Sequence, residues 1–292
     1  MPTNPHPRLA YGAWLAVCFL WGTTYLGIRI ALETVPPMLV GGTRFTMAGA
    51  AILCVMAMLR EKLPSPREWP ALAVLGVLLL GFGNGGVVWA EQTLPSGLTA
   101  VLVATVPFWM VGVEWLAGKP EPFTASRVLG LVVGFLGIVL LVWPELQLGQ
   151  GRAFLGAVGA TQLACVGWAI GSTYSRRRSP TENVLVTAAA QMLFGGLAML
   201  AAGTLLGEWS RLAVSGRSAA AVLYLFLFGS VAGFSAYAYA LKHLPVSTTS
   251  LYAYVNPVIA VVLGTIVLDE SWSPRLVAAG ATVLIGMALV RR

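Results

Sequence analysis

The sequence predicts an all-α polytopic membrane protein with ten transmembrane helices, arranged as two inverted repeats of five helices. Three observations support this prediction: a charged fraction of only 10%, a series of long apolar windows, and a pattern that occurs twice along the chain. Soluble globular domains carry about 25% charged residues. A large soluble helical protein would also need polar faces on its helices, and these windows have none.

Each apolar window is long enough, or nearly so, to cross a bilayer. A spanning helix needs roughly 20 apolar residues at a rise of about 1.5 Å each. The last window is short, and the second contains one charge, Arg44. The first is expected to remain as a span and not to be cleaved as a signal peptide. The windows are 11–28, 38–59, 69–90, 92–113, 128–144, 153–175, 183–207, 218–241, 244–268 and 276–290.

The basic residues predict that both termini lie in the cytoplasm. If each window crosses once, the segments on the side of the termini hold twelve basic residues and the opposite segments hold five. The positive-inside rule assigns the richer side to the cytoplasm. Membrane orientation thus explains the net charge of +7, and nucleic acid is not an expected partner.

The duplicated pattern is clearest around two prolines. Leu94-Pro95 is followed by Pro107 twelve residues after Pro95, and Leu244-Pro245 is followed by Pro257 at the same spacing. The halves align at an offset of 147 over their first two helices and of 150 from the third helix onward. The matched pairs include Gly12 with Gly159, Cys18 with Cys165, Trp21 with Trp168, Arg44 with Gln191, Gly49 with Gly196, and Gly83 with Gly233.

The number of spans in each half determines the relation between the halves. We place the first repeat at 9–144 and the second at 153–290, with five spans in each. Because five is odd, the second half must enter the membrane from the opposite side. Inverted repeats related by an axis in the membrane plane are typical of secondary transporters that work by alternating access.

Glycines and prolines within the spans predict close packing and hinges. The segment 81–86 matches G-x-G-x-x-G, but it lies inside an apolar span and not after a strand, so a dinucleotide site is not expected. Glycines four residues apart favour close helix approach; they are the pairs 81/85, 130/134, 203/207 and 229/233. Pro107 and Pro257 lie midway along their spans and predict kinks that serve as hinges or cavity walls, or inert kinks.

Polar residues within spans are functional candidates because they are costly in lipid. Arg44 could snorkel outward, pair with helix-end carbonyls, or bind a substrate carboxylate. Asn84 has glycine neighbours that leave room for a ligand, and Asn256 could satisfy the backbone freed by Pro257. No carboxylate lies near the centre of a window. This favours facilitated movement down a gradient, or coupling through a route that the sequence hides.

Aromatic residues at depth predict a cavity for organic solutes with few polar groups. Trp21 and Trp168 lie mid-span and are matched in the repeat. The predicted binding residues are Trp21, Tyr25, Arg44, Asn84, Trp168, Tyr237, Tyr252 and Asn256. The three cysteines fall inside windows without metal or disulfide spacing, and no catalytic constellation is present. We therefore expect no cofactor, no metal and no enzymatic activity.

These motifs resemble the EamA-type branch of the drug/metabolite transporter superfamily. The resemblance rests on 21–25 (WGTTY) and 44–45 (RF), and on the segments around the paired prolines. In the second half these are 244–250 (LPVSTTS), 256–257 (NP) and 268–270 (LDE); in the first half they are 94–100 (LPSGLTA), Pro107 and 118–121 (GKPE).

The resemblance implies a multi-pass transporter of the bacterial inner membrane, with a central cavity between the halves. Its substrates would be amino acids or similar small metabolites, and the aromatic and broad-range amino-acid exporters resemble it most. Trp168 matches a cavity position of that group, whereas Ala104 and Val106 stand where larger side chains are expected. The alternatives are a multidrug or toxic-metabolite exporter and a membrane-embedded lipid-modifying enzyme. The protein would be surrounded by the lipid bilayer, and a monomer is the simplest assembly that we expect.

Overall fold

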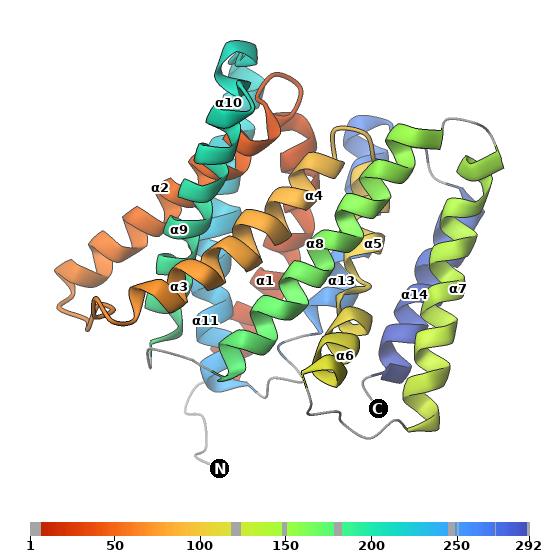
Figure 1. Cartoon of the computed structure of the whole chain (residues 1–292), viewed down its shortest axis with the longest axis horizontal. Coiled ribbons are helices and arrows are strands. Elements are labelled where there is room, and N and C mark those ends of the chain that lie inside the picture. The colour runs from red at the N-terminus through yellow and green to blue at the C-terminus, as the bar shows by residue number, and fades with distance from the viewer. Residues whose placement is uncertain are drawn as a thin grey trace.

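The protein is helical throughout the part of the chain that the computed structural model describes (Figure 1). That part comprises residues 7–117, 124–147, 151–177, 183–244, 249, 251–271 and 273–290, and it contains no strand. The helices of the first half are α1 (Pro7–Ala31), α2 (Pro37–Met58), α3 (Trp69–Gly76), η1 (Val77–Asn84), α4 (Gly85–Ala90), α5 (Ser96–Val103), α6 (Val106–Leu116) and α7 (Ala125–Gln147). Those of the second half are α8 (Gly151–Arg177), α9 (Val184–Leu205), η2 (Glu208–Arg211), α10 (Gly216–Tyr224), η3 (Leu225–Ala232), α11 (Gly233–His243), α13 (Tyr252–Leu268) and α14 (Pro274–Val290).

The helices have the length and surface of a membrane protein. Among the described residues, seven helical segments are long and apolar enough to cross a bilayer, and three shorter apolar helices overlap other predicted windows. The seven are Arg8–Ala31, Pro37–Met58, Trp69–Ala90, Ser96–Leu116, Gly151–Ser175, Val184–Leu205 and Gly216–His243. Large apolar side chains face outward along them and along the shorter helices, as at Phe135 (64% exposed) and Ile266 (71% exposed). Such a surface is suited to lipid and would promote aggregation in water.

The molecule has two distinguishable ends (Figure 1). We call the end that carries the start of α1 and the end of α14 the terminal end. The loops after α1, α4, α9 and α13 lie together at the opposite end, which we call the distal end. The first residue of α1 and the last residue of α14 thus lie at the same end of the molecule.

Helices α2 and α9 cross in direct main-chain contact near the middle of each helix. A Cβ atom added to Gly49 would lie 2.5 Å from both the carbonyl oxygen of Ala189 and the amide nitrogen of Leu193. A Cβ atom added to Gly196 would clash with the main chain of Thr46. Gly49 and Gly196 are separated by 147 residues, and so are Thr46 and Leu193. The two contacts are thus the same contact made in both directions.

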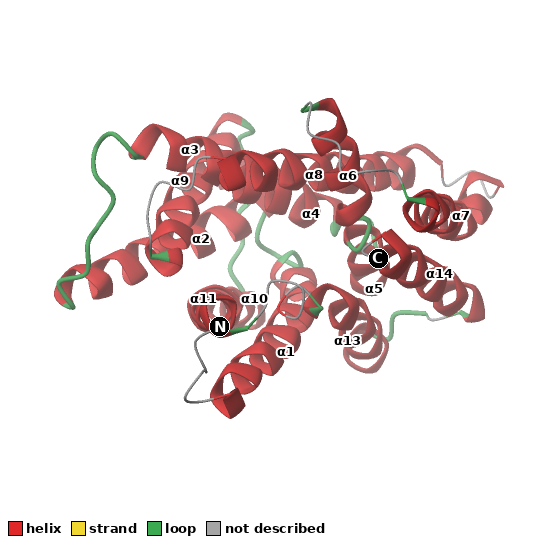
Figure 2. Ribbon diagram, turned by 90° about the horizontal axis from the view of Figure 1, so that it is seen from below, coloured by secondary structure: helices red, strands yellow, loops and turns green. Residues whose placement is uncertain are grey.

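Helices α7 and α14 pack against each other at one edge of the bundle (Figure 2). A Cβ atom on Gly286 would lie 2.5 Å from the amide nitrogen of Gly134 and 2.7 Å from the carbonyl oxygen of Gly130. The predicted packing role of Gly130 and Gly134 is therefore confirmed. For Gly207 it is wrong, because this residue ends α9 in the left-handed region (φ 68°) with open space around its Cα. Glycine adopts this conformation without steric cost.

The third helix of each half contains a π-helical segment. The segments η1 and η3 are eight residues long and are separated by 148 residues. The G-x-G-x-x-G sequence runs from η1 into α4 and is helical throughout, which excludes the strand–turn–helix geometry of a dinucleotide site. π-helical turns are uncommon and occur frequently at functional sites.

The two prolines lie in different local structures. Pro107 is in the first turn of α6, after a break at Ala104 and Thr105, whereas Pro257 is inside α13. The expectation of matching mid-helix kinks is therefore wrong for the first half. A proline in the first helical turn loses no hydrogen bond, because its N–H would be unpaired there anyway. The hydroxyl of Thr105 donates to the Leu102 carbonyl (2.6 Å) at the break.

Candidate functional site

A cavity of about 520 Å³ lies between helices of both halves. Its walls come from α1, α2, η1, α4, α5, α6, α8, α11, α13 and α14. Its volume falls within the range of about 300–1,000 Å³ that is usual for small-molecule sites. All the residues predicted to bind substrate or to act as hinges line it: Trp21, Tyr25, Arg44, Asn84, Pro107, Trp168, Tyr237, Tyr252, Asn256 and Pro257.

One wall of the cavity is an aromatic cluster. Trp21 makes edge contacts with Tyr252 (ring centroids 4.9 Å apart) and Phe234 (5.0 Å), and it lies 5.1 Å from Tyr237. Its indole N–H donates to the carbonyl of Gly229 (3.1 Å), which fixes the ring against η3. Aromatic pairs in these geometries contribute about 0.5–1.5 kcal/mol each beyond area burial. The wall is therefore a rigid apolar surface.

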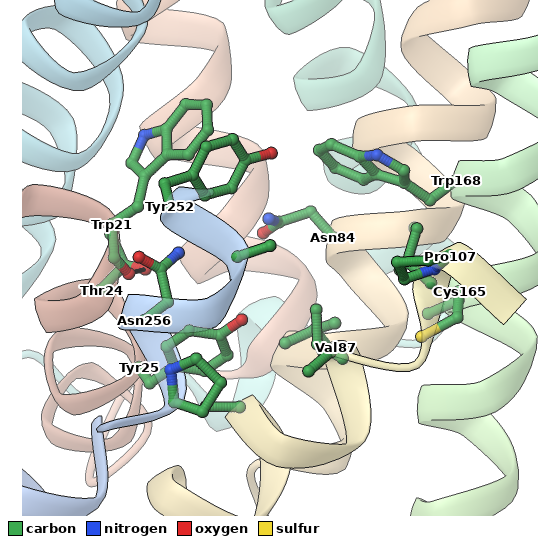
Figure 3. Close-up of a pocket in the computed structure, with 18 of the residues that line it drawn as sticks. Trp21, Thr24, Tyr25, Asn84, Val87, Pro107, Cys165, Trp168, Tyr252 and Asn256 are labelled. Atoms are coloured by element: carbon green, nitrogen blue, oxygen red, sulfur yellow. Dashed lines mark hydrogen bonds between the residues drawn. The ribbon is translucent and has the colours of Figure 1, made fainter. Parts of the chain in front are cut away.

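Trp168 and Asn84 form the facing wall (Figure 3). A Cβ atom added to Gly83 would lie 3.3 Å from the Trp168 ring. A Cβ atom added to Gly233 would lie 2.6 Å from the Trp21 ring. Each tryptophan thus packs against a glycine of the other half. The Oδ1 atom of Asn84 is buried and has no hydrogen-bond partner among the described residues. It is therefore an unpaired acceptor buried in this wall.

Arg44 brings a positive charge to this apolar cavity. The side chain is 3% exposed, so the outward snorkelling considered from the sequence is wrong. Its Nε donates to the Ser230 hydroxyl (2.8 Å), and its Cζ lies 4.4 Å from the centre of the Phe45 ring. Its Nη1 has no partner among the described residues. The guanidinium is therefore fixed by Nε and retains a free donor.

Asn256 has a different structural role from the one that the sequence suggests. With its amide nitrogen turned toward acceptors, it donates to the carbonyls of Cys18 (3.1 Å) and Tyr252 (3.0 Å). Pro257 leaves the carbonyl of Ala253, four residues before it, without its helical partner. The Tyr252 carbonyl is therefore not the one that Pro257 frees. Asn256 therefore joins α13 to α1 beside the cavity.

Two other tyrosines lie within the predicted spans. Tyr239 is not part of the cavity wall, and its ring packs against that of His243 (centroids 4.2 Å apart). The side chain of Tyr254 lies outside the described residues.

At the distal end, carboxylates of the second half cap helices of the first half. Glu208 is 2% exposed, and its Oε2 accepts from the amides of Met38 (3.0 Å) and Leu39 (3.2 Å) at the start of α2. Glu270 accepts from the Ser96 amide (2.8 Å) and hydroxyl (2.9 Å) at the start of α5. A carboxylate is stabilising at a helix N-terminus because it pairs with free N–H groups and the helix dipole.

The contacts between the halves are more exposed at the terminal end. Asn183 caps α9 by accepting from Leu185 (3.0 Å), and its amide donates to the exposed Glu61 at 3.3 Å. The sequence did not predict these carboxylate contacts. The available signal was position: Glu61 and Glu208 each follow a second helix of their half and are 147 residues apart.

The described residues contain no group of three or more His, Cys, Asp or Glu side chains that could hold a metal ion. The residues that line the cavity provide aromatic surface, the buried guanidinium of Arg44 and the unpaired amide oxygen of Asn84. They do not include paired acids or an activated nucleophile.

Comparisons with known proteins identify the family of this chain. The chain is 36% identical over 257 residues to the "Uncharacterized inner membrane transporter YedA" of Escherichia coli, covering 87% of this chain and 81% of that protein. It is 27% identical to "Protein PagO" of Salmonella typhimurium, covering 86% and 82% of the two chains. A crystal structure with 22% identity superposes with a TM-score of 0.66 over 97% of this chain and 98% of the other, which shows a shared fold. The sequence model of the EamA-like transporter family matches residues 8–143 and matches again at 155–292, so this chain belongs to the EamA-like transporter family.

Proposed function

We propose that this chain exports amino acids, broad in range and including aromatic ones, across the bacterial inner membrane. One observation carries the proposal: an unpaired donor and an unpaired acceptor, on Arg44 and Asn84, belong to residues that line one aromatic cavity. An amino acid presents a carboxylate for a guanidinium and an ammonium for an amide oxygen. Its side chain would lie between Trp21 and Trp168. A related protein named as an inner membrane transporter supports the location.

Arg44 also argues for the class of substrate. A buried guanidinium binds carboxylates well and disfavours cationic drugs in the same cavity. The predicted multidrug or toxic-metabolite exporter is therefore the second outcome of a substrate screen. Counterflow in liposomes with labelled amino acids tests the class directly. Flux of dyes and drugs, without flux of any amino acid, would replace the proposed substrate with the alternative.

The role of Arg44 has a matched control in the chain. Arg44→Gln should raise the half-saturation concentration for amino acids about tenfold or more, because a hydrogen bond to a charged group contributes about 1.5–3 kcal/mol. Ser230→Ala removes the bond at Nε but leaves the free Nη1, so its effect should be several-fold smaller. Equal effects would assign Arg44 a packing role. Trp168→Ala should reduce flux most for aromatic amino acids.

We further propose ten spans in two inverted five-helix repeats, 9–144 and 153–290, that work by alternating access. The double family match and the reciprocal contact of Gly49 with Gly196 across α2 and α9 support this arrangement. The carboxylate caps support the view that the distal end is closed in this structure. With the terminal end in the cytoplasm, the distal end is periplasmic. A reporter fused to the C-terminus that is active only in the periplasm would contradict this topology.

Pro107 and Pro257 are the proposed hinges. Both line the cavity, one after a helix break and the other inside a helix. Pro107→Ala and Pro257→Ala should each reduce flux, with the larger effect at Pro257 because α13 there gains a hydrogen bond that stiffens it. Wild-type rates in both variants would remove the hinge role. Binding affinity, measured separately, shows whether the cavity itself is intact.

A further inference from the structure

A buried carboxylate lies beside the distal end of the cavity. Glu91 follows α4 directly, and its side chain is 0% exposed. Neither carboxylate oxygen has a hydrogen-bond partner among the described residues. An unpaired ionised carboxylate in such a place is strongly disfavoured, so the group is stabilised by binding a proton.

The position of Glu91 connects the cavity to the distal end. Val87 lines the cavity, and Glu91 is four residues later, at the C-cap of α4, where its amide donates to the Val87 carbonyl (3.0 Å). Residues four apart lie on one helix face, so Glu91 occupies the next turn toward the distal end. Beyond it, Glu208 and Glu270 cap α2 and α5. Opening of the distal end would expose Glu91 to the water on that side, and opening of the other end leaves it next to the cavity.

The charged groups around Glu91 come from three other segments. The charged groups are Arg29 on α1, Arg44 on α2 and Glu270 after α13. Tyr25 on α1 is a further titratable group near Glu91. Arg29 donates from Nη1 to the main-chain carbonyl of Glu91, so this bond does not pair the carboxylate. Burial raises the pKa of Glu91 well above its ordinary value, and Glu270 raises it further, while Arg29 and Arg44 act in the opposite direction.

We propose that Glu91 is the binding site of a coupling proton, so that amino-acid export is an exchange for protons. This inference rests on the proposed function. A carboxylate oxygen of Glu91 takes a proton from distal water when that end is open, and the O–H bond persists while the end is closed. The proton leaves through the cavity to water on the terminal side before the next substrate is exported. An inward proton gradient thereby drives the return of the empty transporter.

The sign of the pH effect follows from burial. The closed distal end holds Glu91 with a raised pKa, whereas an opened end would hydrate it and return its pKa toward the ordinary value of 4.5. The closed form therefore binds more protons between those two values, and acidification within that window favours closure. Below the ordinary value, both forms are protonated and pH has no further effect. Rising pH within the window favours opening.

Transport by the full chain in liposomes tests the proposal. At one proton per substrate, a gradient of one pH unit should support about tenfold accumulation of an amino acid. Glu91→Gln should abolish this accumulation, and Glu33→Gln should retain it, because Glu33 is an exposed carboxylate at the same end. Accumulation by Glu91→Gln equal to that of wild type would overturn the proposal, and so would wild-type counterflow with no response to the gradient.

A second measurement does not depend on substrate or on flux. Infrared spectra of the wild-type protein near neutral pH should contain the C=O stretch of a buried protonated carboxyl group. The band should disappear in Glu91→Gln, shift in Glu91→Asp if the glutamine variant fails to fold, and remain in Glu33→Gln. Absence of the band in wild type overturns the proton site. If the band is present but no amino acid is carried, the proposed function fails and the proton site stands.

Discussion

The two ends of the molecule join the same two halves in different ways. At the distal end Glu208 is 2% exposed and accepts two amide hydrogen bonds from α2. At the terminal end Glu61, its counterpart 147 residues earlier, is exposed and accepts one hydrogen bond of 3.3 Å from Asn183. Two glutamates that are 147 residues apart thus have unequal surroundings. Because a carboxylate is present at both ends, this difference in burial and hydrogen bonding arises from the conformation of the molecule and not from the residue type.

The largest effect is expected from Glu208→Ala. Loss of a helix cap costs about 0.5–2 kcal/mol, and a change of 1.4 kcal/mol is about tenfold in an equilibrium constant. Ile28 lines the cavity, and the labelling rate of the thiol introduced by Ile28→Cys should therefore rise about tenfold. The measurement uses an impermeant thiol reagent added on the distal side, in a background without the three native cysteines. Unchanged labelling would mean that this cap does not hold the distal end closed.

Glu270→Ala should have the next largest effect, about fivefold on the same labelling rate. The side chain is only partly buried, so water replaces some of its three hydrogen bonds to Ser96 and Gly97 when it is lost. Removing both carboxylates should multiply the two effects if the caps act independently. A double variant no more open than Glu208→Ala would show that the caps of α2 and α5 open as one unit.

Arg217→Ala should change labelling by about twofold or less. Its Nε lies 3.2 Å from Glu33 Oε1, but both side chains are largely exposed, at 57% and 41%. Exposed ion pairs contribute about 0.2–1 kcal/mol and weaken as salt rises. Measured at low and at high salt, the effect should disappear at high salt. A persistent effect would indicate that the distal end depends on this pair more than on the buried caps.

The smallest effect is expected from Glu61→Gln at the terminal end. The exposed side chain keeps an amide oxygen that can accept from Asn183, and surface substitutions of this kind usually change stability by about 0.5 kcal/mol or less. Distal labelling should stay within about twofold of wild type. A response as large as that of Glu208→Ala would show that the two ends are equivalent after all, and it would remove the basis of the comparison.

The long apolar helices and the cavity-lining residues could be predicted from sequence because their signals are local and periodic. Apolar length identifies spans, and mid-span polar or aromatic residues such as Arg44, Trp21 and Trp168 are rare enough to attract attention. All three line the cavity. The predicted close-packed glycines were right where they lie inside helices, as at Gly130 and Gly134, and wrong at Gly207, which ends one.

The burial of Glu91 and the carboxylate caps could not be predicted from sequence, because they depend on contacts between segments that are distant in the chain. Glu91 lies just beyond a span, which is where a solvated carboxylate is normal, and only tertiary packing buries it completely. Glu208 and Glu270 bond to amides about 170 positions away in the chain. The break before Pro107 was missed because proline is compatible both with a kink inside a helix and with the first turn of a new one.

The crossing of α2 and α9 has a mechanical consequence. Gly49 and Gly196 hold two main chains in contact near the midpoint of each helix, so the pair behaves as a fulcrum with an arm on either side. A rigid rotation about a central fulcrum moves the two arms of a lever in opposite directions. If α2 and α9 rock about this contact, as the proposed alternating access requires, then separating the start of α2 from Glu208 would bring the opposite ends, near Glu61 and Asn183, closer together. Any side chain larger than glycine at either position would displace the fulcrum itself.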